Sequence, residues 1–79
     1  MFYIYLLKDE RGKLYTGYTK DLKRRLNEHL RGKTPTTRKM VSPKLFYYEA
    51  YDTEKAARIR EGKLKQHGSS YQGLIKRIT

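Results

Sequence analysis

The chain has 79 residues, 37% of them hydrophobic, so it can form one small domain (residues 1–79) with a correspondingly small core. It contains no cysteine, which excludes a disulfide framework, a thiolate zinc site and a cysteine nucleophile. Nineteen lysines and arginines against eight acidic residues leave a net charge of +11, which favours a polyanionic partner, most simply nucleic acid. The alternatives are a basic protein without such a partner and one that binds an anionic membrane surface.

The N-terminal sequence has the composition of a β-hairpin. Residues 2–8 and 13–19 are rich in aromatic and β-branched residues, and the Asp-Glu-Arg-Gly sequence between them suits a turn. The apolar run in the first strand is far shorter than the roughly 18 residues of a membrane span. Because no basic region precedes it and no small-residue cleavage site follows it, we do not interpret it as a signal peptide. We therefore expect a cytoplasmic protein with no membrane association.

Leucines at helical spacing predict a first helix over residues 20–31, with Thr19 as a candidate N-cap and Gly32 ending it. Three leucines would form the buried stripe of this helix: Leu22, Leu26 and Leu30. Residues 32–43 contain both prolines and are expected to form a polar, basic loop.

The second half of the chain predicts a strand followed by two helices. Residues 44–51 have strand composition, and Asp52 or Thr53 can cap a helix that runs to about Gln66. The expected apolar positions of that helix are Ala56, Ala57, Ile59 and Leu64. Gly68 would end it, and a short third helix would start at Ser69 or Ser70 and carry Leu74, Ile75 and Ile78. The order ββαβαα predicts a compact α+β domain whose small three-stranded, partly antiparallel sheet is flanked by helices.

Tyrosines are concentrated in the predicted hairpin. Alternation places Tyr3 and Tyr5 on one face of the first strand, and Tyr15 and Gly17 on one face of the second. If the register aligns these faces, Tyr5 and Tyr15 approach each other, and Gly17 leaves space for another backbone to come close. Each tyrosine taken alone is more simply structural, since aromatic cross-strand pairs stabilise sheets.

Three polar residues lie at the borders of the predicted apolar stripes. Arg25 and His29 are four residues apart on the first helix, where a side chain can line a groove or be a half-buried structural residue. Glu61 borders the stripe of the second helix among basic neighbours. A carboxylate there can hold a divalent metal beside a phosphate, or it can simply pair with Lys65 one turn later.

In order and spacing these residues resemble the GIY-YIG nuclease superfamily, and most closely its small stand-alone bacterial members, the UPF0213 group. The residues that carry the resemblance are Tyr3-Ile4-Tyr5, Tyr15-Thr16-Gly17, Arg25, His29 and Glu61. The chain departs from the family pattern at Tyr18, where some members have lysine. It also has no asparagine after the helix that bears Glu61, where many members carry one.

The resemblance implies a metal-dependent endonuclease that hydrolyses phosphodiester bonds, most simply in DNA at repair or recombination intermediates. Glu61 would hold one Mg²⁺ or Mn²⁺, and Arg25 would clamp the phosphate oxygens. Either Tyr5 or Tyr15 would orient or deprotonate the attacking water, and His29 would shuttle a proton or contact the phosphate. The alternatives are a catalytically weak or inactive nucleic-acid-binding module of the same fold, and an adaptor that binds another protein.

Seven further basic residues are expected to contact backbone phosphates without reading bases. They are Lys20, Lys23, Arg24, Arg31, Lys33, Arg38 and Lys39. We expect DNA rather than RNA as the partner and a monomer as the default state, with room for an unidentified protein partner.

Overall fold

The computed structural model describes residues 1–32, 39–66 and 69–78. Its elements are β1 (Phe2–Lys8), β2 (Leu14–Thr19), α1 (Leu22–Leu30), β3 (Lys44–Tyr51), α3 (Glu54–Lys65) and α4 (Ser69–Ile78). The predicted ββαβαα order is therefore confirmed, and the first and third strands begin and end at the predicted residues. Gly68 and most of the predicted loop, residues 33–38, lie outside the described residues.

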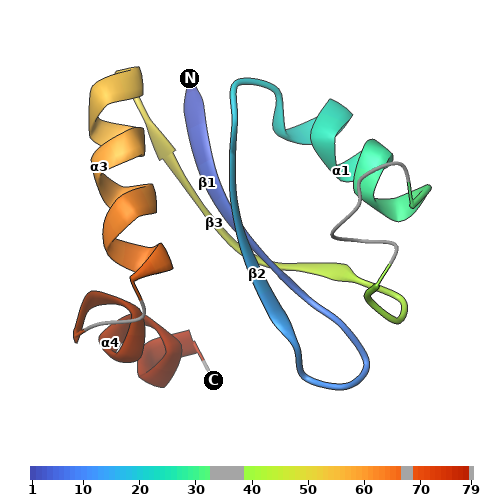
Figure 1. The fold of residues 1–79 in the computed structure, drawn as a ribbon. Coiled ribbons are helices and arrows are strands. Elements are labelled where there is room, and N and C mark those ends of the chain that lie inside the picture. The colour runs from blue at the N-terminus through green and yellow to red at the C-terminus, as the bar shows by residue number, and fades with distance from the viewer. Residues whose placement is uncertain (33–38, 67–68, 79) are drawn as a thin grey trace.

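The sheet has the order β2-β1-β3, so the N-terminal strand is its centre. Both neighbours of β1 are antiparallel to it, which makes the sheet antiparallel throughout, where the element order alone predicted only a partly antiparallel one. Helix α1 covers one face of the sheet and helices α3 and α4 cover the other (Figure 1). The helices in the described part of the chain are all too short or too polar to cross a membrane.

Because helices cover both faces, β1 is buried on both sides, and its alternating side chains belong to two separate core clusters. Ile4 and Leu6 point toward α3 and α4, where they pack with Ala57, Leu64 and Leu74. Tyr5 and Leu7 point the other way and pack with Met40, Tyr15, Leu22 and Leu26. The predicted division of β1 into two faces is confirmed.

The prediction that Leu30 and Ile59 are buried in the core is wrong, because Leu30 is 64% exposed and Ile59 is 51% exposed. At about 100° per residue, a position seven residues after Leu22 lies within about 20° of it, whereas one eight residues later lies about 80° away. His29 therefore takes the buried place in the last turn of α1 that was assigned to Leu30. Helix α3 follows the same rule, since its buried residues Ala57 and Leu64 are seven apart.

The N-terminus of α1 also differs from the prediction. Asp21, not Thr19, is the N-cap, and its carboxylate accepts a hydrogen bond from the backbone N–H of Arg24. Thr19 instead accepts a hydrogen bond from the Asp21 N–H at 3.0 Å, which holds the turn between β2 and the helix. Thr53 caps α3, as one of the two predicted alternatives.

A buried carboxylate fixes the loop that precedes β3. Asp9 accepts hydrogen bonds from the backbone N–H groups of Arg11, Lys13 and Val41. Although burial acts to raise the pKa of Asp9, these hydrogen bonds outweigh it and lower the pKa below its ordinary value. By holding Val41, Asp9 keeps the adjacent Met40 in the core beside Tyr5.

The contrast between Leu64 and Ile59 gives a test of the packing. Replacing the fully buried Leu64 with alanine should lower the free energy of unfolding by about 2–5 kcal/mol, a large fraction of what a small domain has. Ile59→Ala on the same helix should change it by less than about 0.5 kcal/mol, because Ile59 is largely exposed. Denaturant unfolding followed by circular dichroism measures both, and equal losses would contradict the burial described for α3.

Candidate active site

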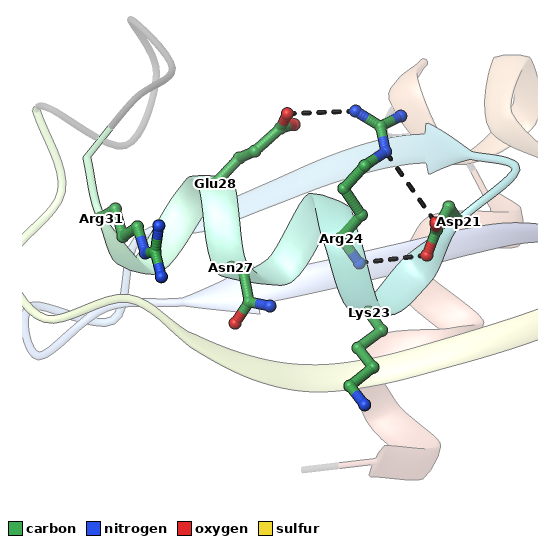
Figure 2. Close-up of a pocket in the computed structure, with 6 residues that line it drawn as sticks. All are labelled: Asp21, Lys23, Arg24, Asn27, Glu28 and Arg31. Carbon is green, nitrogen blue, oxygen red and sulfur yellow. Dashed lines mark hydrogen bonds and ion pairs between the residues drawn. The ribbon is translucent and has the colours of Figure 1, made fainter.

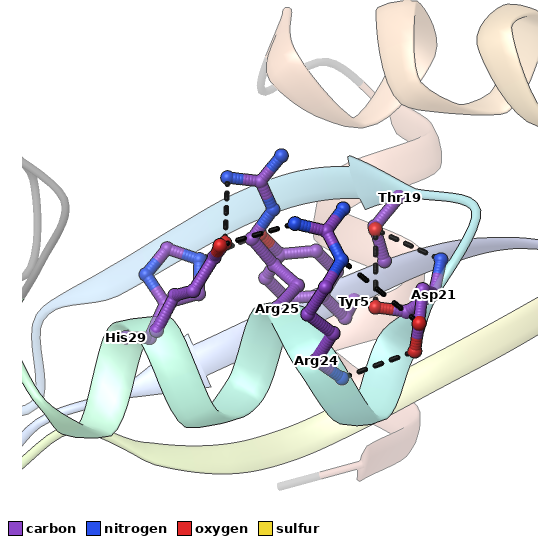
Figure 3. A network of polar contacts seen from close by, with 7 residues as sticks. Tyr5, Thr19, Asp21, Arg24, Arg25 and His29 are labelled. Atoms are coloured by element: carbon purple, nitrogen blue, oxygen red, sulfur yellow. Dashed lines mark hydrogen bonds and ion pairs between the residues drawn. The ribbon is translucent and has the colours of Figure 1, made fainter.

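Tyr5 and His29 form a buried polar pair between the sheet and α1. The Tyr5 hydroxyl lies 2.7 Å from Nε2 of His29. Tyr5 is 1% exposed and His29 3% exposed, and their ring centroids are 5.5 Å apart. Figure 3 shows the two rings with Arg25 beside them. A direct hydrogen bond thus connects two predicted site residues that are 24 positions apart in the sequence.

Gly17 allows the Tyr5 ring to lie where it does. The two residues are paired across the β1–β2 ladder, and a Cβ atom at Gly17 would overlap the Tyr5 ring and its hydroxyl. The expectation that Gly17 leaves space for another backbone is therefore wrong, because the side chain of its cross-strand partner fills that space. The glycine of the Tyr15-Thr16-Gly17 motif serves to position Tyr5.

Tyr15 completes a cluster of three rings. Its centroid lies 6.3 Å from that of Tyr5 and 5.7 Å from that of His29, the latter in an edge-on arrangement. The predicted approach of Tyr5 and Tyr15 is confirmed. Aromatic contacts of this kind restrict the orientation of the imidazole as well as adding packing energy.

The environment keeps both members of the polar pair uncharged near neutral pH. Burial raises the pKa of Tyr5, and the neighbouring Tyr15 raises it further, while Arg25 acts in the opposite direction. Burial also lowers the pKa of His29 below its ordinary value, and the positive charge of Arg25 adds to this effect. In the imidazole tautomer that carries its proton on Nδ1, the Tyr5 hydroxyl donates this hydrogen bond to Nε2, and in the other tautomer Nε2 donates it to the hydroxyl.

Arg25 brings positive charge to the edge of the cluster. Its Nη1 lies 3.4 Å from a carboxylate oxygen of Glu28, and the same carboxylate pairs with Arg24 at 3.1 Å. The Nε atom of Arg25 is buried and has no hydrogen-bond partner among the described residues. A buried guanidinium N–H without an acceptor is costly in a protein interior, and a phosphate oxygen would satisfy it.

Glu61 approaches the same region from α3. Its side chain is 13% exposed and pairs with Lys65 at 3.0 Å and with Arg58 at 3.4 Å, so the alternative predicted ion pair with Lys65 is present. Its negative charge helps to raise the pKa of Tyr5, after the larger effects of burial and Tyr15. No three His, Asp or Glu residues in the described ranges are placed to hold a metal together.

A groove of about 480 Å³ runs beside β2 between α1 and α3. It is lined by Tyr18, Thr19, Lys20, Arg24, Arg25, Glu54 and Arg58. The Tyr18 hydroxyl donates to Glu54 at 2.7 Å, and the Arg58 guanidinium lies 3.9 Å from the centre of the Tyr18 ring. Sequence reasoning missed Arg58 as a site residue, although its place three residues before Glu61 puts the two on one helix face.

The predicted phosphate-binding residues divide between two surfaces. Lys20 and Arg24 line the groove beside β2, and Arg24 also lines, with Lys23 and Arg31, a shallow depression on the outer face of α1 (Figure 2). There Arg24 is held by Asp21 and Glu28. Lys39 is exposed in the loop before β3, and the two remaining predicted residues, Lys33 and Arg38, lie outside the described residues.

Comparison with known proteins identifies the family. The model of the GIY-YIG catalytic domain matches residues 1–74. The chain belongs to the GIY-YIG family. A UPF0213 protein of Streptococcus agalactiae is 46% identical to this GIY-YIG domain over 65 residues, which are 81% of this chain and 74% of the relative. A UPF0213 protein of Streptococcus pyogenes is 41% identical over 73 residues, covering 91% of this chain and 79% of the relative.

The solution NMR structure of a UPF0213 protein from Bacillus halodurans has a similar fold. It superposes with a TM-score of 0.61 and 28% sequence identity, over 100% of this chain and 86% of the other. The GIY-YIG family is a nuclease superfamily, so a nuclease-type function with a nucleic-acid substrate is supported for this domain. The resemblance inferred from the motifs is thus confirmed.

The lowered pKa of His29 predicts how stability depends on pH. Below 6.5, the ordinary pKa of histidine, the unfolded chain binds a proton that buried His29 does not yet accept. The free energy of unfolding should therefore fall as the pH drops below 6.5. The fall should end once the pH is below the pKa of His29 in the folded state. Unfolding curves between about pH 7.5 and pH 5, above the window in which most carboxylates titrate, measure this.

The matched comparison removes one histidine at a time. The chain has two histidines, so a His67→Gln background leaves His29 as the only imidazole that titrates. Adding His29→Gln to that background should flatten the dependence on pH. If the free energy of unfolding still depends on pH to the same extent without His29, this dependence does not come from His29.

Proposed function

We propose that this GIY-YIG domain is a divalent-metal-dependent endonuclease that hydrolyses phosphodiester bonds, acting on DNA as a cytoplasmic monomer at repair or recombination intermediates. The observation that carries this proposal is the buried Tyr5–His29 hydrogen bond beside a guanidinium whose buried Nε has no acceptor in the part of the chain that the structure describes. A net charge of +11 supplies the general attraction to a polyanion.

Arg25 is proposed to bind the scissile phosphate. Its planar guanidinium can donate two parallel hydrogen bonds to non-bridging oxygens, and Nε, which has no acceptor within residues 1–32, 39–66 and 69–78, can provide one of them. Negative charge grows on these oxygens as water attacks the phosphorus atom, so a fixed positive charge stabilises the transition state more than the ground state. Glu28 holds Arg25 in the absence of substrate and would yield it to the phosphate.

Tyr5 and His29 are proposed to take the proton of the attacking water. Because its raised pKa keeps the Tyr5 hydroxyl protonated, Tyr5 alone is a poor base. However, Nε2 of His29 lies 2.7 Å from this hydroxyl and can accept its proton. Tyr5 can receive a proton from water as it passes its own proton to Nε2 of His29, which becomes an imidazolium. This pairing favours Tyr5 over Tyr15 as the group that contacts the water, with Tyr15 orienting the imidazole.

Glu61 is proposed to hold one Mg²⁺ or Mn²⁺. A single carboxylate at 13% exposure suits a magnesium ion that keeps several waters, and binding would release the ion pairs to Lys65 and Arg58. When bound, such an ion supplies positive charge to the phosphate and to the leaving oxygen.

A second candidate is a nucleic-acid-binding module with little or no catalysis. The ion pairs that Lys65 and Arg58 make with Glu61 favour it, because they compete with a metal for the carboxylate. The lack of an asparagine after α3, where many family members carry one, points the same way.

A cleavage assay separates the two candidates. Labelled single-stranded, duplex, flap and branched DNA, and RNA, are incubated with the protein in Mg²⁺ or Mn²⁺, with EDTA as the metal-free control. We expect cleavage that requires metal and falls about 100-fold or more in each variant, since Arg25→Ala removes a positive charge at the phosphate and Glu61→Gln removes the carboxylate proposed to hold the metal. Arg24→Ala is the matched control for Arg25, because it removes a neighbouring arginine that pairs with the same Glu28.

The outcomes point in distinct directions. Activity that survives both Arg25→Ala and Glu61→Gln would belong to a contaminant and would contradict the nuclease. Binding of DNA without cleavage of any substrate would establish the binding module. Loss of activity in Arg24→Ala equal to that in Arg25→Ala would contradict the role assigned to Arg25.

The outer face of α1 predicts a specific dependence on salt. Wild-type binding should weaken steeply with ionic strength, and Lys23→Ala and Arg31→Ala should each reduce the logarithmic salt slope by about one. Arg24→Ala should reduce it less, because Asp21 and Glu28 already neutralise that arginine in part. Fluorescence anisotropy of a labelled oligonucleotide in EDTA at several salt concentrations measures the slopes, and a flat response in the wild type would contradict phosphate contacts.

A further inference from the structure

A second groove lies between the N-terminal turn of α1 and the sheet, and Arg25 does not line it. It has a volume of about 490 Å³, and its lining includes Tyr3, Tyr48, Lys20, Lys23, Leu22 and Leu26. We propose that this groove binds an unpaired nucleobase of the substrate, which stacks on Tyr48 while the lysines contact the flanking phosphates. The inference rests on the proposed function, because it names the kind of strand that the domain engages.

Tyr48 has the properties of a stacking platform. It lies on β3 directly across from Tyr5 in the ladder and is nevertheless 52% exposed. The half-buried Tyr3 meets it edge-on, with ring centroids 6.3 Å apart and planes inclined by 61°. The ring of Tyr48 is thus supported from one side while much of its surface remains open to solvent. Every nucleobase has a π-face that can stack on such a ring, whatever its sequence.

The charge around the groove suits a nucleic-acid strand rather than an apolar peptide. Lys20 and Lys23 are exposed and flank the aromatic pair. The groove also contains Asp21, but this carboxylate caps α1 through the Arg24 N–H and lies 3.9 Å from the Arg24 guanidinium. Its negative charge is therefore engaged within α1, and the two lysines set the sign of the groove.

The groove is continuous with the candidate active site. Lys20 lines both this groove and the one that contains Arg25. Tyr3 precedes Tyr5 by two residues on the same face of β1, a distance of about 7 Å. A strand with one phosphate at Arg25 can therefore pass Lys20 and place a neighbouring base at Tyr48. Such a base must be unpaired, because a base inside a duplex stacks on its neighbours and cannot also stack on a side chain.

The test compares single-stranded with duplex binding in EDTA, so that cleavage does not interfere. Anisotropy of labelled oligonucleotides gives the affinities, and a single-stranded oligonucleotide carrying the fluorescent base 2-aminopurine reports stacking through quenching. Tyr48→Ala should weaken single-stranded binding about tenfold and abolish the quenching, with duplex affinity changed less than about twofold. Tyr48→Phe keeps the ring and should behave as the wild type. Leu45→Ala, on the same strand and 38% exposed, is the control for loss of exposed apolar surface.

Each outcome decides the proposal. If Tyr48→Ala weakens single-stranded and duplex binding equally, or leaves both unchanged, the groove does not bind a base. If Tyr48→Phe fails as Tyr48→Ala does, or if Tyr48 instead mediates a concentration-dependent dimer, the stacking role is also overturned. Selective loss without any cleavage activity would keep the base site while the nuclease assignment fails. A wild-type protein that binds no nucleic acid would overturn both.

Discussion

The contact between the Tyr5 ring and Gly17 is the constraint on which the candidate site depends. Tyr5 lies in the middle of the central strand, and the ladder places it between Gly17 of β2 and Tyr48 of β3. Only a residue without a side chain at position 17 lets the ring lie over β2 and reach His29. The hydrogen bond of Tyr5 therefore follows from the strand register, which is set by the whole sheet rather than by a flexible loop.

The same arrangement explains how so short a chain can hold a buried polar pair. Tyr5 and His29 belong to the core between β1 and α1, so residues proposed to act on the substrate also carry part of the packing. Their mutual hydrogen bond avoids the cost of an unsatisfied buried polar group. The buried members of the hydrophobic cluster on the opposite face, Ile4, Leu6, Ala57, Leu64 and Leu74, are all apolar.

The strands and their faces could be predicted from the sequence, because successive side chains of a strand point to opposite faces of the sheet and this fixes which residues share a face. The helices were harder, since their buried side depends on how each one rests on the sheet. Leu30 and His29 are adjacent in sequence, and only the contact with Tyr5 decides that the histidine is inside. The approach of Tyr5 to Tyr15 followed from strand alternation, whereas the family resemblance was needed to group them with Arg25 and His29, and the roles of all four stay predictions. The ion pairs of Glu28 with Arg24 and Arg25 have helical spacing and could be read from the sequence. The contact between Arg58 and the Tyr18 ring joins α3 to β2, so spacing alone does not encode it.

Tyr18 is the departure from the family that the structure explains best. Some family members have a lysine at this position, but here the ring of Tyr18 lies under the guanidinium of Arg58. A positive charge is thus present at this point of the groove, supplied by α3 instead of β2. Arginine keeps its charge at any physiological pH and binds oxyanions through a planar fork, whereas lysine is a point charge whose pKa shifts readily on burial. The replacement therefore alters the geometry with which the groove meets a phosphate without removing its positive charge, and the change at Tyr18 alone does not favour the binding module over the nuclease.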